Sequence, residues 1–260
     1  MRKADSFSDD LTDDAVLGGR LRLRQPQRGH RVGHDAILLA ASCPARSGDR
    51  VVDLGAGVGA AGFALATRVA GAAVTLVEVD AALAALAGQN AQLNDLAGRV
   101  RTVTLDVSAP ARAFSAAGLA PDSVTHVLMN PPFNDPQRQR SSPDHRRRLA
   151  HAASRAQLPL WIRTAARLLR PRGTLTLIWR ADGLADVLAA LAPAFGGVAI
   201  RPVHPRPDAP AIRVIVNAVK ASKAPLALLP GLTLNDETGR PTQAAEAVLR
   251  GGAVLTPGAP

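Results

Sequence analysis

The chain has 260 residues, and its 31 lysines and arginines against 21 aspartates and glutamates give a formal net charge of +10. Hydrophobic residues make up 47% of the sequence and charged residues 20%, which excludes a wholly disordered chain. The single cysteine, Cys43, excludes an internal disulfide framework, and no apolar run approaches the ~20 residues of a membrane-spanning helix. We therefore expect a cytoplasmic protein of about one domain, without a membrane segment and with an acidic partner.

The N-terminal residues divide into a tail and an extension. Residues 1–14 contain five aspartates and are expected to form an acidic mobile tail. The alternation of polar and apolar residues over 20–24 predicts a half-exposed strand, and residues 35–41 predict a short helix with Asp35 near its N-cap. Residues 15–49 are thus expected to be an extension packed on the main domain.

From residue 50 onward, short β-branched runs alternate with longer stretches rich in alanine and leucine. Strands are predicted at 51–54, 74–77, 100–105, 126–129, 174–179 and 212–219, and helices at 60–69, 80–93, 109–117, 158–169 and 184–191. This alternation is typical of an α/β domain, here residues 50–222, with a mostly parallel sheet and helices on both faces. Polar residues at 130–144 and prolines at 202–210 predict two long loops, and residues 223–260 predict a turn and a short helix at 241–250.

A glycine-rich segment follows the first predicted strand of this domain. Asp53 precedes Gly55-Ala56-Gly57-Val58-Gly59 at the point where strand passes into helix, and glycines there let the backbone approach a ligand closely. The same glycines weakly match a dinucleotide-binding pattern. Glu78 and Asp106 follow the next two strands, so three carboxylates meet at one edge of the sheet, which disfavours a pyrophosphate. S-adenosylmethionine, with its ribose diol, adenine amine and cationic amino acid end, suits that edge, although Asp53 and Asp106 could simply cap the turns that follow them.

Asn130-Pro131-Pro132-Phe133 ends the fourth predicted strand of the domain. The two prolines stiffen the backbone, so that Asn130 and the Pro131 carbonyl can present acceptors in a fixed geometry to a planar amine. The aromatic ring of Phe133 could stack on the ring that bears this amine. A simple proline turn would explain the prolines but not the asparagine and the aromatic residue.

At these motifs the sequence resembles the small-domain class I methyltransferases, and within them the valine-tRNA adenine-N6 methyltransferases. The likeness runs from about Thr12 to Arg250. It rests on the glycine loop and Asn130–Phe133, together with 12–14, 17–21, Gln25, 29–31, 34–36, 77–80, 149–151 and 244–252. It implies a Rossmann-like sheet whose last strand is antiparallel, with a small N-terminal strand and helix extension.

The resemblance also implies roles for individual residues. Gly55, Ala56, Gly57 and Gly59 would lie against the amino acid portion of S-adenosylmethionine, Glu78 would hold its ribose hydroxyls, and Asp106 its adenine amine. Asp53 belongs to the same cofactor set, and Asp35 would help to close it. The catalytic set would be Asn130, Pro131, Pro132 and Phe133 around the target nitrogen. His30 stands where these proteins often carry tyrosine, which puts any contact of a phenol there in doubt.

Basic residues gather after the asparagine–proline motif. We expect them to bind RNA phosphates beside the target base; they are Arg138, Arg140, Arg146, Arg147 and Arg148. A second group brackets the proline-rich loop and the final predicted strand, and we expect it to bind phosphates as well; its members are Arg201, His204, Arg206, Arg213, Lys220 and Lys223. Codon usage could account for the scarcity of lysine, and a solvated arginine face for the clusters.

The expected function is methylation of N6 of an anticodon-loop adenine in tRNA, by a monomer that needs no metal, because the histidines show no metal-binding spacing. Three alternatives stay open within this fold: a guanine-N2 methyltransferase of ribosomal RNA, a glutamine methyltransferase of a release factor, and a catalytically silent RNA-binding protein. A nicotinamide-dependent oxidoreductase is the rival from another class.

Overall fold

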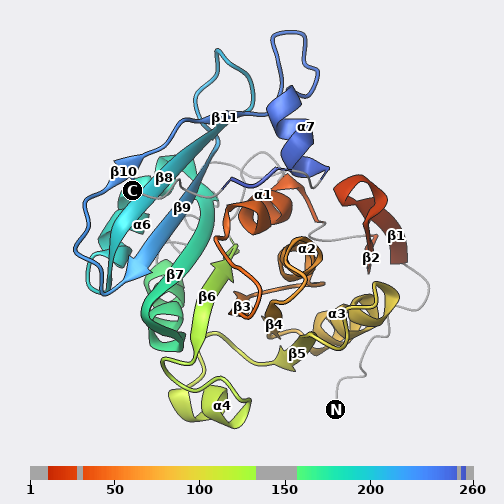
Figure 1. Cartoon of the computed structure of the whole chain (residues 1–260), viewed down its shortest axis with the longest axis vertical. Coiled ribbons are helices and arrows are strands. Elements are labelled where there is room, and N and C mark those ends of the chain that lie inside the picture. Colours follow the sequence, from red (N-terminus) through yellow and green to blue (C-terminus); the bar gives the residue numbers. More distant parts are fainter. Residues whose placement is uncertain (1–10, 28–31, 133–156, 251–252, 256–260) are drawn as a thin grey trace, which may run out of the picture.

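The computed structural model describes residues 11–27, 32–132, 157–250 and 253–255, and all structural statements refer to these residues. They form a nine-stranded main sheet (Figure 1). Its strands are β3 (Arg50–Leu54), β4 (Ala73–Glu78), β5 (Val100–Thr104), β6 (Val124–Met129), β7 (Leu169–Arg180), β8 (Phe195–His204), β9 (Arg213–Lys220), β10 (Ala227–Leu228) and β11 (Leu232–Thr233). Their order is β10-β8-β9-β7-β6-β3-β4-β5, and β11 pairs with β8 further along the same edge.

The sheet is parallel except at one strand. β3 pairs in parallel with β4 and β6, β4 with β5, and β6 with β7. β9, inserted between β7 and β8, runs antiparallel to both. The predicted mostly parallel sheet with an antiparallel last long strand is therefore confirmed.

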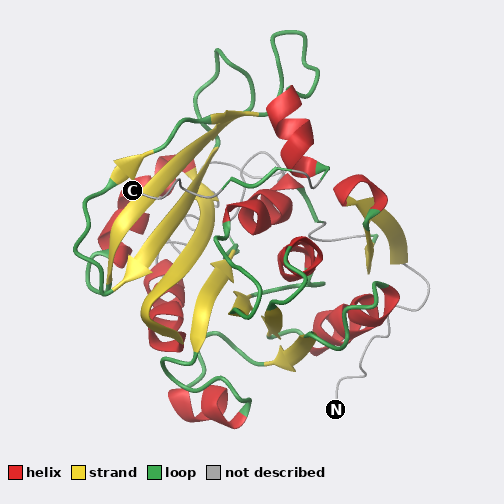
Figure 2. Ribbon diagram, in the orientation of Figure 1, coloured by secondary structure: helices red, strands yellow, loops and turns green. Residues whose placement is uncertain are grey.

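Helices cover both faces of the sheet (Figure 2). They are α1 (His34–Ser42), α2 (Ala60–Arg68), α3 (Ala81–Leu93), α4 (Ala111–Ala116), a helix over residues 157–168, α6 (Leu184–Leu191) and α7 (Gln243–Leu249). Strand residues alternate between two cores, since Val51 packs with α1, α2 and α3 while Val52 packs with α4, the 157–168 helix and α6. Burial on both faces explains the continuous apolar runs of these strands in the sequence. None of the helices in the described residues is long and apolar enough to span a membrane.

The N-terminal part is a hairpin followed by α1. β1 (Leu11–Val16) pairs antiparallel with β2 (Leu21–Pro26) through a 3-10 turn, η1 (Leu17–Gly19). The predicted strand over 20–24 is thus confirmed, but residues 11–14 are not part of a tail, because they pair with β2; residues 1–10 lie outside the described residues. The tail prediction failed there because the charged residues of β1 are partnered, as in the ion pair of Asp13 with Arg22 at 2.6 Å.

Two strands differ from the sequence expectation. β7 begins at Leu169, where the preceding helix was expected to end, and a register shift against β6 accommodates the residues before Thr174. β8 was not predicted, because Gly196, Gly197 and Pro202 are poor strand formers. Pairing with β9 overrides these local preferences, with a bulge at the glycines. The predicted C-terminal helix is confirmed as α7, whose N-cap Thr242 accepts a hydrogen bond from Ala245 N.

Candidate active site

The predicted site residues lie at the carboxyl ends of adjacent parallel strands. β6, β3, β4 and β5 are neighbours in the sheet, and Asn130, Asp53, Glu78 and Asp106 lie in or just after these strands at their carboxyl ends. Backbone hydrogen bonds tie the strand ends together, with Gly55 N donating to Val77 O at 2.8 Å and Leu105 N to Glu78 O at 2.9 Å. The structure thus brings the asparagine and the three carboxylates to one edge.

In the glycine loop between β3 and α2, one glycine is needed for close packing and another leaves open space at the site. Gly55, Gly57 and Gly59 have φ of +70°, +56° and +92°, the left-handed region that favours glycine. A Cβ on Gly59 would lie 2.3 Å from Phe63, so that glycine is needed for packing. A Cβ on Gly57 would meet nothing within 4 Å, so Gly57 faces open space at the site.

Glu78 is held in one orientation by backbone amides. Its Oε2 accepts from Gly57 N at 2.8 Å, its Oε1 accepts from Asp80 N at 3.0 Å, and the residue is 8% exposed. Each oxygen keeps a further lone pair for a ligand hydroxyl. The Gly57 amide, which a pyrophosphate would need, already donates to a carboxylate, and this arrangement disfavours dinucleotide binding.

Asp53 and Asp106 each use one oxygen as a cap. Asp53 is 3% exposed and its Oδ2 accepts from Gly62 N at 2.9 Å, while Asp106 Oδ1 accepts from Ser108 N at 2.6 Å. Burial raises the pKa of Asp53 to about 7. The negative charge of Glu78 also raises this pKa, whereas the hydrogen bond from the Gly62 amide lowers it. The hydrogen bonds of Ser108 lower the pKa of the exposed Asp106. Asp106 therefore offers a charged carboxylate to the edge, whereas Asp53 is enclosed beneath the loop.

Asn130 carries an unsatisfied acceptor. The residue is half-buried, and its Oδ1 is buried without a hydrogen-bond partner among the described residues. Such an atom costs free energy unless a donor reaches it. Pro131 is buried and Pro132 exposed, while Phe133, Arg138, Arg140 and Arg146–Arg148 lie outside the described residues.

Asp35 is placed away from the three carboxylates. Its Oδ2 accepts from Arg213 Nε at 3.0 Å, and Arg213 begins β9 opposite Arg180 at the end of β7. Asp35 therefore lies at the carboxyl edge on the β7 and β9 side, beyond β6. The cofactor-closing role that the resemblance implied for Asp35 stays a prediction.

Trp161 is a site residue that the sequence reasoning missed. A Cβ built on Gly55 would lie 2.3 Å from Cη2 of Trp161, so the six-membered ring of the indole rests on the glycine loop. The side chain is half-buried and packs at the margin of the core that contains Leu158 and Ile162. Its position three residues after Leu158 placed it on the sheet-facing side of the helix, and this spacing was the available signal.

The second predicted RNA-binding group does not form one surface. Arg201 donates to Pro230 O at 2.7 Å, and His204 Nδ1 lies 2.9 Å from Ala209 O. Lys220 bonds Leu169 O at the other end of β9 from Arg213, about 23 Å away along an extended strand. These three side chains each stabilise the fold locally, and the binding of RNA by this group stays a prediction.

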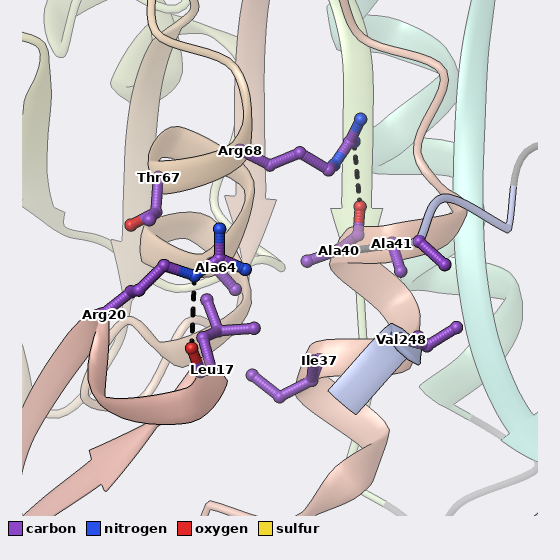
Figure 3. A pocket seen from close by; sticks show the side chains of 10 residues that line it. Leu17, Arg20, Ile37, Ala40, Ala41, Ala64, Thr67, Arg68 and Val248 are labelled. Atoms are coloured by element: carbon purple, nitrogen blue, oxygen red, sulfur yellow. Dashed lines mark hydrogen bonds between the residues drawn. The ribbon is translucent and has the colours of Figure 1, made fainter. Parts of the chain in front are cut away.

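A hollow between η1, α1, α2 and α7 is separate from this edge (Figure 3). Its walls are mainly apolar, with Arg20 and Arg68 as the two cations. Arg20 donates to Leu17 O and Arg250 O, and Arg68 donates to Ala40 O and Cys43 O. Both guanidinium groups therefore join elements around the hollow.

Comparison with known proteins gives consistent similarities. The model of the family described as Methyltransferase small domain matches residues 30–201. A tRNA1(Val) (adenine(37)-N6)-methyltransferase of Dyadobacter fermentans is 29% identical over 160 residues, 62% of either chain. The protein of that name in Dickeya chrysanthemi is 30% identical over 165 residues, 61% of this chain and 60% of its own. The matches thus span less than two thirds of these two relatives.

Solved structures agree with the fold. A predicted O-methyltransferase from Agrobacterium tumefaciens is 32% identical with a TM-score of 0.74, and the match covers 86% of this chain and 100% of that one. A SAM-dependent O-methyltransferase from Thermotoga maritima, 19% identical with a TM-score of 0.52, shares the fold over 76% of this chain and 69% of its own.

Proposed function

The chain belongs to the methyltransferase small domain family, and on that premise we propose that it methylates the N6 amine of an adenine in the anticodon loop of a tRNA. The observation that carries this proposal is the buried, unpartnered Oδ1 of Asn130 at the end of β6. The names of the relatives from Dyadobacter fermentans and Dickeya chrysanthemi support the choice of adenine and of tRNA. An RNA substrate of this kind would be met in the cytoplasm.

The cofactor is S-adenosylmethionine, which supplies an electrophilic methyl group on a sulfonium sulfur when bound. The glycine loop fits its amino acid portion, because Gly57 leaves open space where another residue would place a Cβ. Glu78 would accept hydrogen bonds from the ribose hydroxyls with its free lone pairs, and Asp106 one from the adenine amine. Val79, apolar yet 62% exposed between Glu78 and Asp80, would cover the adenine ring.

Asn130 and Pro131 would position the target amine. An exocyclic NH₂ group has two hydrogens, and the Asn130 side-chain oxygen and the Pro131 carbonyl are two acceptors. Donation to both would draw the nitrogen toward tetrahedral geometry and direct its lone pair at the methyl carbon. The bound cofactor would supply the methyl group and keep the electron pair of its sulfur–carbon bond, and the nitrogen held by Asn130 and Pro131 would release its proton to water. Catalysis is by positioning and polarisation, without a general base.

The unsatisfied acceptor favours nitrogen over oxygen as the methylated atom. A hydroxyl group has only one proton to donate, so it would leave one of the two acceptors without a partner. Adenine, guanine and glutamine all carry an NH₂ group. We assign adenine in tRNA because of the relatives, and the arginines at 138–148 support this choice because phosphate binding suits an RNA substrate.

The substrate class is tested with tritiated S-adenosylmethionine and three separate pools from a strain that lacks the gene: tRNA, ribosomal RNA and protein. We expect label in tRNA alone. Label in ribosomal RNA would indicate the guanine enzyme, and label in protein the glutamine enzyme; either result would contradict the proposal. Asn130→Ala serves as the control for contaminating methyltransferases, because its preparation should label tRNA at least about 10²-fold more slowly than the wild type.

A further inference from the structure

Asn90 of α3 and Asn94, the C-cap residue of that helix, pair with the free edge of β2. On one side β2 pairs with β1; on the other, Arg22 N donates to Asn94 Oδ1 at 2.8 Å and Asn94 Nδ2 donates to Arg22 O at 2.7 Å. Asn90 does the same at Arg24, with distances of 2.9 and 3.0 Å. The side-chain amides thus take the place of a third strand.

The spacing of the two asparagines explains the match. Four residues of α-helix rise about 6 Å, and two residues of strand about 6.7 Å. Asn90 in the last turns of α3 and Asn94 at its C-cap therefore face positions 24 and 22 of β2. A carboxamide has the same donor and acceptor as a peptide group. The hairpin is therefore docked by directional bonds as well as by apolar contact.

Asn90 differs from Asn94 in its remaining hydrogen. The second N–H of Asn94 Nδ2 donates to Asn90 O in the last turn of α3 at 2.8 Å. The second N–H of Asn90 Nδ2 reaches Val58 O in the glycine loop at 3.1 Å. Asn90 is 0% exposed, so no solvent could replace this bond. One buried amide therefore joins the N-terminal hairpin to the loop.

The hydrogen bond from Asn90 to Val58 lies next to the one that orients Glu78. Gly57 N donates to Glu78, and the next residue, Val58, accepts from Asn90, so two peptide groups close together in the loop are held by different elements. Without the Asn90 donor, the buried Val58 carbonyl would lose its partner. The loop could then regain one only by turning, which would disturb Gly57 and the orientation of Glu78.

We propose that Asn90 is a positioning residue that couples the docking of the β1–β2 hairpin to the shape of the cofactor loop. This inference rests on the proposed binding of S-adenosylmethionine at the loop. Because coupling between two sites is reciprocal, cofactor binding also stabilises the contact of β2 with α3. The hairpin is thereby part of the cofactor site, although none of its residues needs to touch the cofactor.

Matched variants test the coupling. Asn90→Asp keeps the size of the side chain and the acceptor for Arg24 N but removes both donors, and Asn94→Asp makes the same change where no loop contact exists. We expect Asn90→Asp to raise the Kd for S-adenosylhomocysteine, measured by titration calorimetry, at least about tenfold. Asn94→Asp should leave it within about twofold of the wild type. Equal weakening in both variants, or none in Asn90→Asp, would overturn the inference.

A measurement on the wild-type chain does not depend on how the variants fold. Amide hydrogen exchange, followed by NMR with and without S-adenosylhomocysteine, should slow at Arg24 when the ligand binds, and more than at Arg22. Exchange at Arg24 that ignores the ligand, while the ligand binds normally, refutes the coupling alone. Absence of any binding by the wild type refutes the proposed function, and the coupling falls with it.

Discussion

Asn130 is the residue on which the proposed chemistry depends, since its buried Oδ1 has no hydrogen-bond donor among the described residues. Asn130→Ala removes this acceptor and leaves the glycine loop and Glu78 unchanged. We expect kcat with tRNA to fall by about 10²–10³, because the acceptor acts on the amine as its geometry changes. Steady-state kinetics measures the fall.

The same variant should bind S-adenosylmethionine with a Kd within about twofold of the wild type. Titration calorimetry provides this comparison. A loss of cofactor affinity as large as the loss of kcat would show that Asn130 supports the cofactor site and not the target amine.

Asp53 gives the stability a distinct pH dependence. Its pKa in the fold is about 7, above the ~3.9 of an unfolded aspartate, so protonation is favoured by folding. The stability that this proton contributes is complete below about pH 4 and is lost as the pH rises through 7. Asp53→Asn keeps an acceptor for Gly62 N but cannot ionise. Its melting temperature should exceed that of the wild type at pH 8, and the difference should shrink toward pH 5.

Asp106→Asn is the matched control for this titration. The pKa of Asp106 is lowered, so its carboxylate is charged throughout the window from about pH 5 to 8. Its substitution should shift the melting temperature by a constant amount over that range. If the difference in melting temperature between Asp53→Asn and the wild type is equally constant from about pH 5 to 8, Asp53 does not titrate in that range, and burial does not raise its pKa as described.

At the scale of elements, the helix over 157–168 reports on the glycine loop through Trp161. The chain has two tryptophans, and Trp179 is 4% exposed within β7. Trp179→Phe leaves the indole on Gly55 as the fluorophore, and we expect its emission to change when S-adenosylhomocysteine binds. Trp161→Phe leaves Trp179, whose emission should stay constant during the titration. A signal that follows Trp179 would contradict the contact of the helix with the cofactor site.

The repeating part of the fold was predictable because its signals are local. Apolar runs mark the strands at 51–54 and 74–77, and apolar residues at helical spacing mark the helices after them. Because the strands are parallel, their carboxyl ends must lie at the same edge of the sheet. That order brought Glu78, Asp106 and Asn130 to one edge without any knowledge of side-chain positions.

The remaining features depend on partners distant in the chain. β8 is a strand because β9 pairs with it, in spite of its glycines and proline. Asn90 reads as one more polar residue of an alanine-rich helix, and only the approach of β2 and Val58 gives it a function. Trp161 likewise acquires its place from the loop that it covers. Such contacts leave no periodic signal in the sequence.

At the scale of the whole molecule, the net charge is +10, and in the described part of the chain several basic side chains serve the fold itself. Several arginines join elements internally: Arg68 bonds Ala40 and Cys43, Arg99 bonds Val69, and Arg167 lies 4.9 Å over the ring of Phe114. The proposed RNA contacts therefore rest on the cluster at 138–148, which lies outside the described residues.

Salt dependence tests that cluster. If Arg146, Arg147 and Arg148 bind phosphates, substituting all three by alanine should weaken tRNA binding and reduce the slope of log Kd against log salt by about 2. Arg240→Ala, at an exposed arginine in the C-terminal turn, should change neither quantity. Fluorescence anisotropy with labelled tRNA over a range of KCl concentrations measures both. A slope unchanged in the triple variant would remove the cluster from the RNA interface.

The most direct test of the central claim is the identity of the methylated nucleoside. Transfer RNA from a strain that lacks the gene is incubated with the purified protein and S-adenosylmethionine, digested to nucleosides and analysed by mass spectrometry. The account predicts N6-methyladenosine, formed by the wild type and formed at least about 10²-fold more slowly by Asn130→Ala. A methylated ribose, a methylated guanine, or N6-methyladenosine formed equally well by Asn130→Ala would contradict it.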